Sequence, residues 1–155
     1  MHHLNNNPSQ EAYTIIVDDD HDDCALFQDC FQHLNWHHQV KTFTDAESLL
    51  ALLDATPDER LLPTLIVLDY NLPRLAGEKA LMLLKKDKRY KQIPIVMYSI
   101  SMTDQKEIQL RELGANRCRQ KPVTIDGMHK FTAELIELSQ TTHCVYPQKE
   151  LHSQY

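Results

Sequence analysis

Carboxylates directly follow two short β-branched runs of this sequence, and their spacing points to a cation site. Asp18, Asp19 and Asp20 follow an Ile-Ile-Val run, and Asp69 follows a Leu-Ile-Val-Leu run. Two carboxylates ~4 Å apart repel by roughly 1 kcal/mol in water and by about 4 kcal/mol at an effective dielectric constant of about 20, so acids that meet must share protons or hold a cation. Because the set offers oxygen ligands and neither Cys nor His, it favours Mg²⁺, with Mn²⁺ as a substitute.

A hydroxyl group and an ammonium group follow two further runs. Ser99 comes directly after the apolar run 93–98, and Lys121 comes after the more polar run 117–120. Beside a bound phosphoryl group, Lys121 would neutralise one oxygen and Ser99 would donate a hydrogen bond to another. With a metal ion screening its charge, Asp69 could act as a nucleophile and become an aspartyl phosphate.

Short strands and amphipathic helices alternate along the chain and would position these groups. Hydrophobic runs predict strands at 14–17, 40–43, 64–68, 93–98 and 117–120, the second and last of which are polar enough for sheet edges. Apolar periodicity and first-turn acids predict helices at 24–36, 46–53, 78–86, 103–113 and 125–139. Gly114 should end the fourth helix as a left-handed C-terminal cap.

This alternation implies right-handed crossovers around a parallel sheet that is covered on both faces, which is a three-layer α/β domain. In open parallel sheets, ligands bind outside the carboxyl ends of the strands, where the strand order reverses. The acids, Ser99 and Lys121 all follow predicted strands. We therefore expect them to meet in one crevice.

Length and composition exclude several classes of protein. With 155 residues, 42% of them hydrophobic, the chain has the size of one domain. Its 16 Lys and Arg against 22 Asp and Glu give a formal net charge of −6, which argues against binding of nucleic acid through its phosphates. The 3 Gly stand far apart, at Gly77, Gly114 and Gly127, so neither a Walker-type phosphate loop nor a G-x-G-x-x-G dinucleotide turn can be formed.

The length of the apolar runs and the spacing of the cysteines indicate the compartment in which the protein acts. No apolar run approaches the ~20 residues that a bilayer span needs, and the 4 Cys show no C-x-x-C pairing. We expect a soluble, cytoplasmic protein without a membrane partner.

The chain divides into three parts. Residues 1–12 are expected to be a flexible leader, 13–140 the folded domain, and 141–155 a C-terminal tail too short for an output module.

Four segments together resemble the receiver domain of two-component response regulators, of the stand-alone, chemotaxis type. They are 15–20, 65–77, 93–99 and the Lys-Pro pair at 121–122. The acid pair, the Asp-x-Asn-Leu-Pro-x-x-x-Gly segment, the Ser and the Lys-Pro pair occur in this order, each at a predicted strand end. The resemblance covers roughly 13–138 and implies a flavodoxin-like fold, a doubly wound five-stranded parallel sheet of order 2-1-3-4-5.

The resemblance also implies roles for the acids. Asp69 would accept a phosphoryl group from a histidine kinase or a phosphotransfer protein in a phosphorelay. Mg²⁺ would be held by Asp18, Asp19, Asp69 and the backbone carbonyl of Asn71, with Asp18 acting directly or through water. Such a phosphoprotein is no enzyme in the ordinary sense, although it assists its own phosphorylation and dephosphorylation.

The resemblance further implies that Ser99 and Lys121 hold the phosphoryl group and shift when it arrives. That movement would change the surface formed by the fourth helix, the fifth strand and the fifth helix. The Lys121–Pro122 peptide bond is expected to be cis. Signalling would then proceed by contact with another protein downstream.

Two positions depart from the pattern of this family, and a third feature concerns self-association. Cys118 stands three residues before Lys121, where chemotaxis-type members usually have an aromatic residue, so the output surface there should differ. Ile100 follows Ser99, where the family tends to have a small residue, and could restrict access to Asp69.

The predicted edge strand also carries two arginines. Arg117 and Arg119 could meet acidic groups of a second copy in a homodimer.

Two other functions remain open at this point. A receiver-like module could dock to partners without being phosphorylated. A haloacid-dehalogenase-like phosphatase could use Asp18 and Asp20 as its Asp-x-Asp pair, although Asp22 stands where that pattern has Thr or Val. The phosphatase interpretation also leaves Asp69 without a role.

Overall fold

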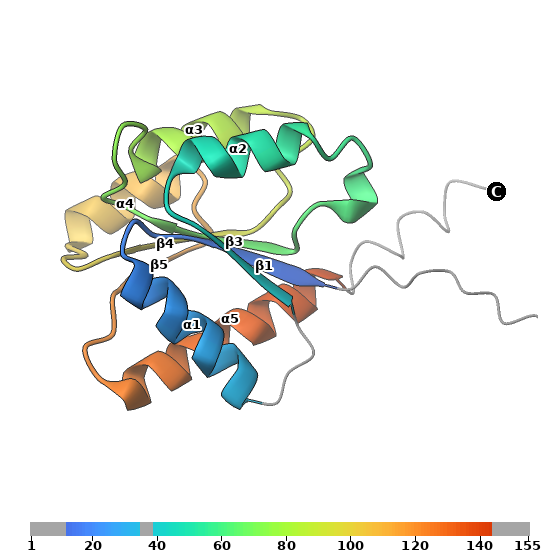
Figure 1. Ribbon diagram of the computed structural model, residues 1–155. Helices are drawn as coiled ribbons and strands as arrows, with labels where there is room; N and C mark the ends of the chain where they lie inside the picture. The colour runs from blue at the N-terminus through green and yellow to red at the C-terminus, as the bar shows by residue number, and fades with distance from the viewer. Residues whose placement is uncertain (1–11, 35–38, 144–155) are drawn as a thin grey trace, which may run out of the picture.

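The computed structural model describes residues 12–34 and 39–143, and Figure 1 shows their arrangement. The strands are β1 (Tyr13–Val17), β2 (Gln39–Phe43), β3 (Leu65–Asp69), β4 (Ile95–Ser99) and β5 (Arg117–Gln120). The helices are α1 (His21–His33), α2 (Ala46–Asp54), α3 (Gly77–Lys86), α4 (Asp104–Glu112) and α5 (Ile125–His143), with a short 3₁₀ helix η1 (Glu59–Leu61) after α2.

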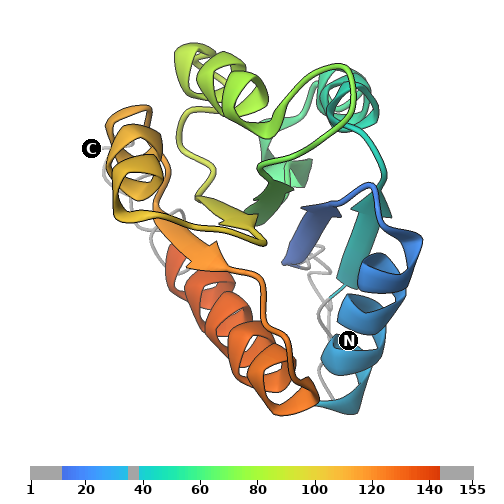
Figure 2. The same ribbon diagram turned by 90° about the vertical axis from the view of Figure 1, so that its left-hand side faces the viewer.

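The five strands form one parallel sheet in the order β2-β1-β3-β4-β5. Helices α2, α3 and α4 cover one face, and α1 and α5 cover the other (Figures 1 and 2). The expected flavodoxin-like, three-layer fold is therefore confirmed, with β2 and β5 at the edges. The strand order reverses between β1 and β3, because the chain moves outward to β2 first and then returns past β1.

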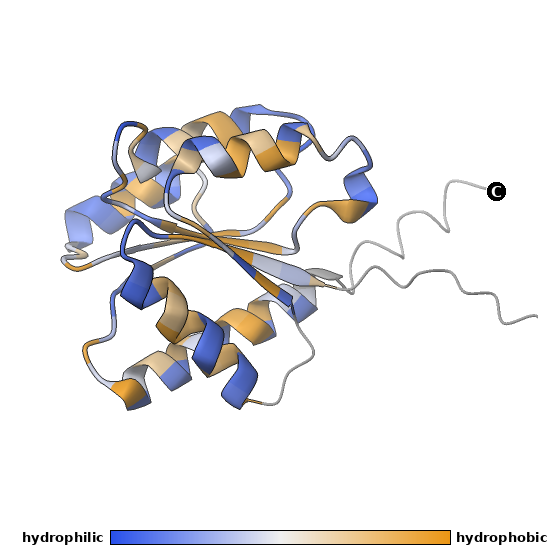
Figure 3. Ribbon diagram, in the orientation of Figure 1, coloured by the Kyte–Doolittle hydropathy of each residue, from blue (hydrophilic) through white to orange (hydrophobic). Residues whose placement is uncertain are grey.

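Alternating side chains of the central strands fill two separate cores. In β1, Ile15 and Val17 pack with α2 and α3, whereas Ile16 packs with α1 and α5. The same alternation runs through β3 and β4, which explains why these strands are apolar at nearly every position (Figure 3). Two buried faces fix the register of these strands, since a slip of one residue would exchange the two cores.

Helix α1 begins at His21, three residues earlier than the sequence pattern predicts, because Asp20 caps it. The Asp20 carboxylate accepts hydrogen bonds from the backbone N–H groups of Asp22 and Asp23. The apolar periodicity begins only at Cys24, so the acidic first turn carries no periodic signal. The predicted end of this helix at 36 lies outside the described residues.

The other element bounds differ little from those predicted. Strand β4 begins at Ile95, because Pro94 has no N–H to donate to the ladder. Helix α5 continues to His143, past the predicted end at 139. Gly114 has a φ of 111° just after α4, which confirms a positive-φ cap at this helix end.

Gly77 lies so close to the end of β3 that it has no room for a side chain. A Cβ atom there would lie 2.1 Å from the backbone carbonyl oxygen of Asp69. The Gly77 N–H also donates to the carbonyl oxygen of Tyr70, at 3.2 Å. The glycine therefore lets α3 start directly against the segment that carries Asp69.

We predict that Gly77→Ala lowers the unfolding free energy by about 1–3 kcal/mol, because backbone must move to admit the methyl group. The measurement is chemical denaturation followed by circular dichroism. Gly127→Ala is the comparison, since a Cβ atom at Gly127 meets only side-chain atoms of Thr124 and Pro122 within 3.4 Å. Equal stabilities of Gly77→Ala and the wild type would contradict this account of the close approach.

Candidate functional site

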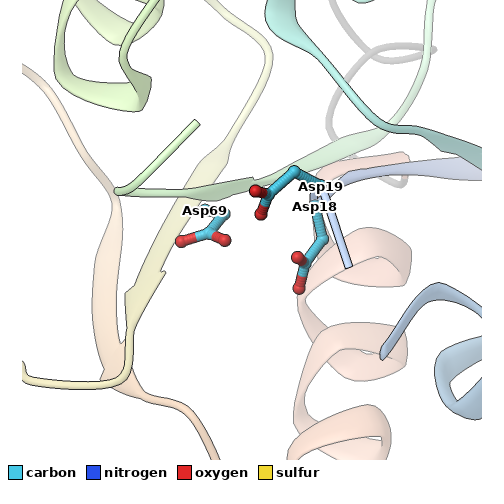
Figure 4. Close-up of side chains that lie close together, drawn as sticks. All are labelled: Asp18, Asp19 and Asp69. Atoms are coloured by element: carbon cyan, nitrogen blue, oxygen red, sulfur yellow. The ribbon is translucent and has the colours of Figure 1, made fainter. Parts of the chain in front are cut away.

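The ends of β1 and β3 bring three carboxylates together. Asp18 and Asp19 follow β1, and Asp69 ends β3. One oxygen from each of the three lies within 4.8 Å of the others, and Figure 4 shows the side chains gathered at this edge of the sheet. Asp18 and Asp69 are buried, whereas Asp19 is exposed. The predicted convergence of these acids is thus found in the structure.

Lys121 enters this cluster from the end of β5. Its Nζ atom lies 2.9 Å from Oδ2 of Asp69, 3.1 Å from Oδ2 of Asp18 and 3.6 Å from Oδ2 of Asp23. Burial alone would lower the pKa of the ammonium group, but its hydrogen bonds and attraction to Asp69 and Asp18 outweigh burial and raise the pKa. Lys121 is therefore firmly charged and holds two buried carboxylates.

The protein surrounds the Asp18 carboxylate with hydrogen-bond donors. Oδ1 accepts from the backbone N–H of Asp20 at 2.9 Å, and Oδ2 accepts from both the Tyr98 hydroxyl and the Lys121 ammonium group. Burial would raise the pKa of Asp18, but the Tyr98 hydrogen bond, the Asp20 N–H and Lys121 together lower it. Asp18 is consequently a fully buried anion.

Asp69 has fewer donors than Asp18. Its Oδ1 accepts from the backbone N–H of Asn71 at 3.0 Å, and its Oδ2 accepts from Lys121. Burial raises the pKa of Asp69 and outweighs these two hydrogen bonds. The negative charge of Asp18 is thus better stabilised by hydrogen-bond donors than the negative charge of Asp69.

An acidic pocket opens above these groups. Its lining residues are Asp19, Asp20, His21, Asp22, Asp23, Asp69, Asn71, Ile100 and Lys121. Asp69 is therefore reachable from solvent although its own side chain is only 3% exposed. Ile100 lines the pocket and is 73% exposed, and its role in access to Asp69 stays a prediction.

Ser99 and Cys118 occupy buried positions. The Ser99 hydroxyl accepts from the backbone N–H of Ser101 at 3.3 Å, and Ser99 is not among the residues that line the pocket. Cys118 is 3% exposed, with its thiol directed at the backbone carbonyl of Glu107 in α4. Because Cys118 is buried, an output surface here would be formed by its neighbours and not by Cys118 itself.

The expectation of a cis peptide bond between Lys121 and Pro122 is wrong for this structure. The described residues contain no cis peptide bond, so this one is trans. The trans form is the lower in energy for most X–Pro bonds. The Lys121 N–H, which belongs to the preceding peptide bond, donates to the Ser99 carbonyl oxygen at 2.8 Å and pairs the backbone with the end of β4.

Tyr98 is a site residue that the sequence did not identify. It belongs to a strand that is buried on both faces, so alternation of polar and apolar residues gives no sign of the direction of its side chain. The structure directs its hydroxyl to Asp18 and places its ring 4.8 Å from Nζ of Lys121. Burial and the Asp18 charge raise the pKa of Tyr98, so its hydroxyl acts as a donor.

The donor set fits a hard divalent cation. Asp18, Asp19 and Asp69 supply oxygen atoms only, and two neighbouring strand ends hold them close together. Further carboxylates line the pocket together with Lys121, which pairs with Asp18, Asp23 and Asp69. A cation such as Mg²⁺ or Mn²⁺ would relieve the remaining repulsion.

Arg117 and Arg119 on the edge strand β5 are paired within the chain. Both contact Oε1 of Glu134 in α5, at 2.8 Å and 2.6 Å. Burial would raise the pKa of Glu134, but these hydrogen bonds lower it. A role for the two arginines in a homodimer stays a prediction, and it would require them to exchange or share this partner.

Comparisons with known proteins agree on one family. The family described as "Response regulator receiver domain" matches residues 14–133. The chain is 24% identical over 127 residues to the "Probable methanogenesis regulatory protein FilR2" of Methanothrix harundinacea (strain 6Ac), which covers 79% of this chain and 80% of that protein. Separately, none of the described helices has the length and apolar character that a membrane crossing requires.

Solved structures give the same result. The Mn²⁺-bound form of the response regulator Rcp1 is 26% identical, with a TM-score of 0.68 over 78% of this chain and 88% of that chain. The phosphorylated cyanobacterial phytochrome response regulator RcpA is 26% identical, with a TM-score of 0.74 over 85% of this chain and 96% of that chain.

Proposed function

The chain belongs to the response regulator receiver domain family, and from this premise we propose that Asp69 is its phosphoacceptor. Receiver domains are phosphorylated by histidine kinases, and the donor here would be such a kinase or a phosphotransfer protein. The observation that carries the proposal is the environment of Asp69, which lines an open acidic pocket while Lys121 and the Asn71 N–H hold its two oxygens.

We propose that Asp18, Asp19, Asp69 and the backbone carbonyl of Asn71 hold Mg²⁺, for which Mn²⁺ could substitute. The proximity of the three carboxylates supports this ligand set, as does the Mn²⁺-bound state of the similar Rcp1 structure. Bound in the pocket, the ion supplies positive charge beside the oxygens of the transferring group.

With the metal ion bound, the residues of the chain would take the following parts in the transfer. A carboxylate oxygen of Asp69 attacks the phosphorus atom, the new O–P bond forms, and the P–N bond of the phosphohistidine breaks. The electron pair of that bond remains on the imidazole nitrogen, which takes up a proton. The Lys121 ammonium group, already 2.9 Å from the Asp69 carboxylate, is placed to neutralise an oxygen of the transferred group, and Ser99 would donate to another.

Phosphorylation would then signal by protein contact. The phosphoryl group adds about −1.5 to −2 charges at the end of β3. Attraction of Lys121 towards it would weaken the bond between Lys121 and Asp18 and displace the chain that connects β5 to α5. The surface formed by α4, β5 and α5 is the region expected to change for a downstream protein.

The test uses the protein with Mg²⁺ and a small phosphodonor such as acetyl phosphate, followed by intact mass measurement. We expect one added phosphoryl group, which hydrolyses over time and is absent when EDTA removes the metal. A protein that gains no phosphoryl group, and whose spectra BeF₃⁻ with Mg²⁺ leaves unchanged, would contradict the proposal and favour a module that docks without phosphorylation.

The geometry does not favour the phosphatase alternative. That function requires Asp18 as an accessible nucleophile and Asp20 as an acid. The Asp18 side chain is fully buried, and the Asp20 carboxylate caps α1 through two backbone N–H groups. Neither group is free for the role that the alternative assigns to it.

We predict that Ile100→Ala shortens the lifetime of the phosphorylated protein. Ile100 lines the pocket, and its β-branched side chain would restrict the approach of water to phosphorylated Asp69. The measurement is the rate of loss of the phosphoryl group after the donor is removed, with the exposed Ile108→Ala in α4 as the control. Equal lifetimes of the Ile100→Ala and wild-type proteins would refute this restriction.

A further inference from the structure

Tyr98 contacts both charged groups that flank the phosphoacceptor without lining the pocket itself. Its hydroxyl donates to Oδ2 of Asp18, and its ring lies 4.8 Å from Nζ of Lys121. Lys121 in turn contacts Oδ2 of Asp69 at 2.9 Å. One buried side chain therefore touches the carboxylate on one side of the site and the ammonium group on the other.

Helices α1 and α5 fix the orientation of this tyrosine. The Tyr98 ring meets the ring of Phe27 edge to face, with centroids 5.8 Å apart and planes at 88°, and lies 6.2 Å from the ring of Phe131. Tyr98 is 1% exposed, so its ring has no alternative space. Its hydroxyl consequently reaches Asp18 from a fixed direction.

We infer that Tyr98 is a positioning residue, which holds the Asp18 carboxylate and the Lys121 ammonium group in the arrangement that Mg²⁺ binding and phosphoryl transfer require. The inference rests on the proposed function. Tyr98 and Lys121 together occupy Oδ2 of Asp18, and the Asp20 N–H occupies one site on Oδ1. The carboxylate can therefore turn in neither direction without losing a donor.

The loss of the hydroxyl has a defined consequence. In Tyr98→Phe, one acceptor site on Oδ2 of Asp18 is left without a donor in a buried place. Among the hydrogen bonds of the described residues, Asp18 is then held only by those from the Asp20 N–H and Lys121, and Lys121 can follow the carboxylate away from Asp69 if it turns. Residues that orient metal ligands typically contribute ~10–100-fold to metal affinity or activity.

Tyr90 offers a matched control. It is also a buried tyrosine, 4% exposed, and its hydroxyl donates to Oδ1 of Asp54 at 2.8 Å. Tyr90 packs in the core beside α2 and α3, and neither Tyr90 nor Asp54 lines the acidic pocket. Tyr90→Phe therefore removes the same kind of hydrogen bond, from a buried tyrosine to an aspartate, at a distance from the site.

The experiment measures the dissociation constant of Mg²⁺ by isothermal titration calorimetry, together with the midpoint of thermal unfolding in EDTA. We expect both variants to unfold at lower temperature than the wild type. Only Tyr98→Phe should bind Mg²⁺ at least ~10-fold more weakly. In an Asp18→Asn background, the further change Tyr98→Phe should alter Mg²⁺ binding by less than about twofold, because the group it positions is already changed.

The outcomes separate this inference from the proposed function. If the wild type binds Mg²⁺ and accepts a phosphoryl group while Tyr98→Phe binds Mg²⁺ as tightly as Tyr90→Phe, the positioning role is refuted and the proposed function stands. If Tyr98→Phe retains its full effect in the Asp18→Asn background, Tyr98 does not act through Asp18 and the inference is also overturned. A wild type that neither binds Mg²⁺ nor accepts a phosphoryl group contradicts both.

Discussion

Asp69→Asn is expected to abolish phosphorylation, with no added phosphoryl group detectable by intact mass after incubation with Mg²⁺ and acetyl phosphate. The side-chain amide is not a nucleophile comparable to the carboxylate, and it removes one of the three acids that approach within 4.8 Å of one another. The second effect should weaken Mg²⁺ binding, which calorimetry measures independently of the transfer.

The Asp69→Asn protein should still fold. Burial raises the pKa of Asp69, so the folded protein without metal disfavours its charge. A neutral Asn relieves that cost while it removes an acceptor from Lys121, and we expect a change in unfolding free energy of less than about 1 kcal/mol. Asp54→Asn, which changes an aspartate away from the pocket, should be phosphorylated like the wild type. Phosphorylation of Asp69→Asn at the wild-type rate would place the phosphoacceptor elsewhere.

Lys121→Met is expected to lower the unfolding free energy by about 3 kcal/mol at pH 7 and to slow phosphorylation severely. The change leaves two buried carboxylates without their shared ammonium group, and removal of one partner from a buried pair typically costs ~3–5 kcal/mol. Chemical denaturation and the rate of mass increase measure the two effects. Lys79→Met, at an exposed position of α3, is the control and should change neither.

The pH dependence of Lys121→Met should differ from that of the wild type in a defined direction. In the wild type, the lowered pKa of Asp18 contributes stability that is present above its unfolded pKa and is lost as pH falls through the folded value. In the variant, Asp18 loses a charged partner, so its folded pKa rises and acidification relieves the repulsion from Asp69. The difference in unfolding free energy between the two proteins should therefore shrink from pH 7 to pH 5, and a constant difference would contradict this account.

Added Mg²⁺ should also reduce the difference in unfolding free energy between the wild type and Lys121→Met, because the ion replaces part of the missing positive charge.

The sequence predicted the sheet and the acidic cluster because both depend on local patterns that can be recognised in the sequence itself. A strand that is buried on both faces is an unbroken apolar run, and the residue after it lies at the carboxyl edge of the sheet. This reasoning placed Asp18, Asp69 and Lys121 at one site, as the structure confirms. It also placed the two more polar strands at the edges of the sheet.

The features that the sequence did not reveal depend on side-chain direction and close approach. Tyr98 lies in an apolar run, so the direction of its hydroxyl follows only from the packing of Phe27 and Phe131 around its ring. The tight contact of Gly77 with the Asp69 carbonyl depends on the path of the loop between β3 and α3. The unequal compensation of Asp18 and Asp69 depends on donors from four different parts of the chain.

The most direct test of the central claim is to identify the phosphorylated residue. An acyl phosphate on an aspartate is reduced by borohydride to homoserine, which peptide mass mapping locates. The account predicts that wild-type protein treated with Mg²⁺ and acetyl phosphate, and then with borohydride, carries homoserine in place of Asp69 and nowhere else. Homoserine at another aspartate, or a peptide containing unmodified Asp69 from fully phosphorylated protein, would contradict it.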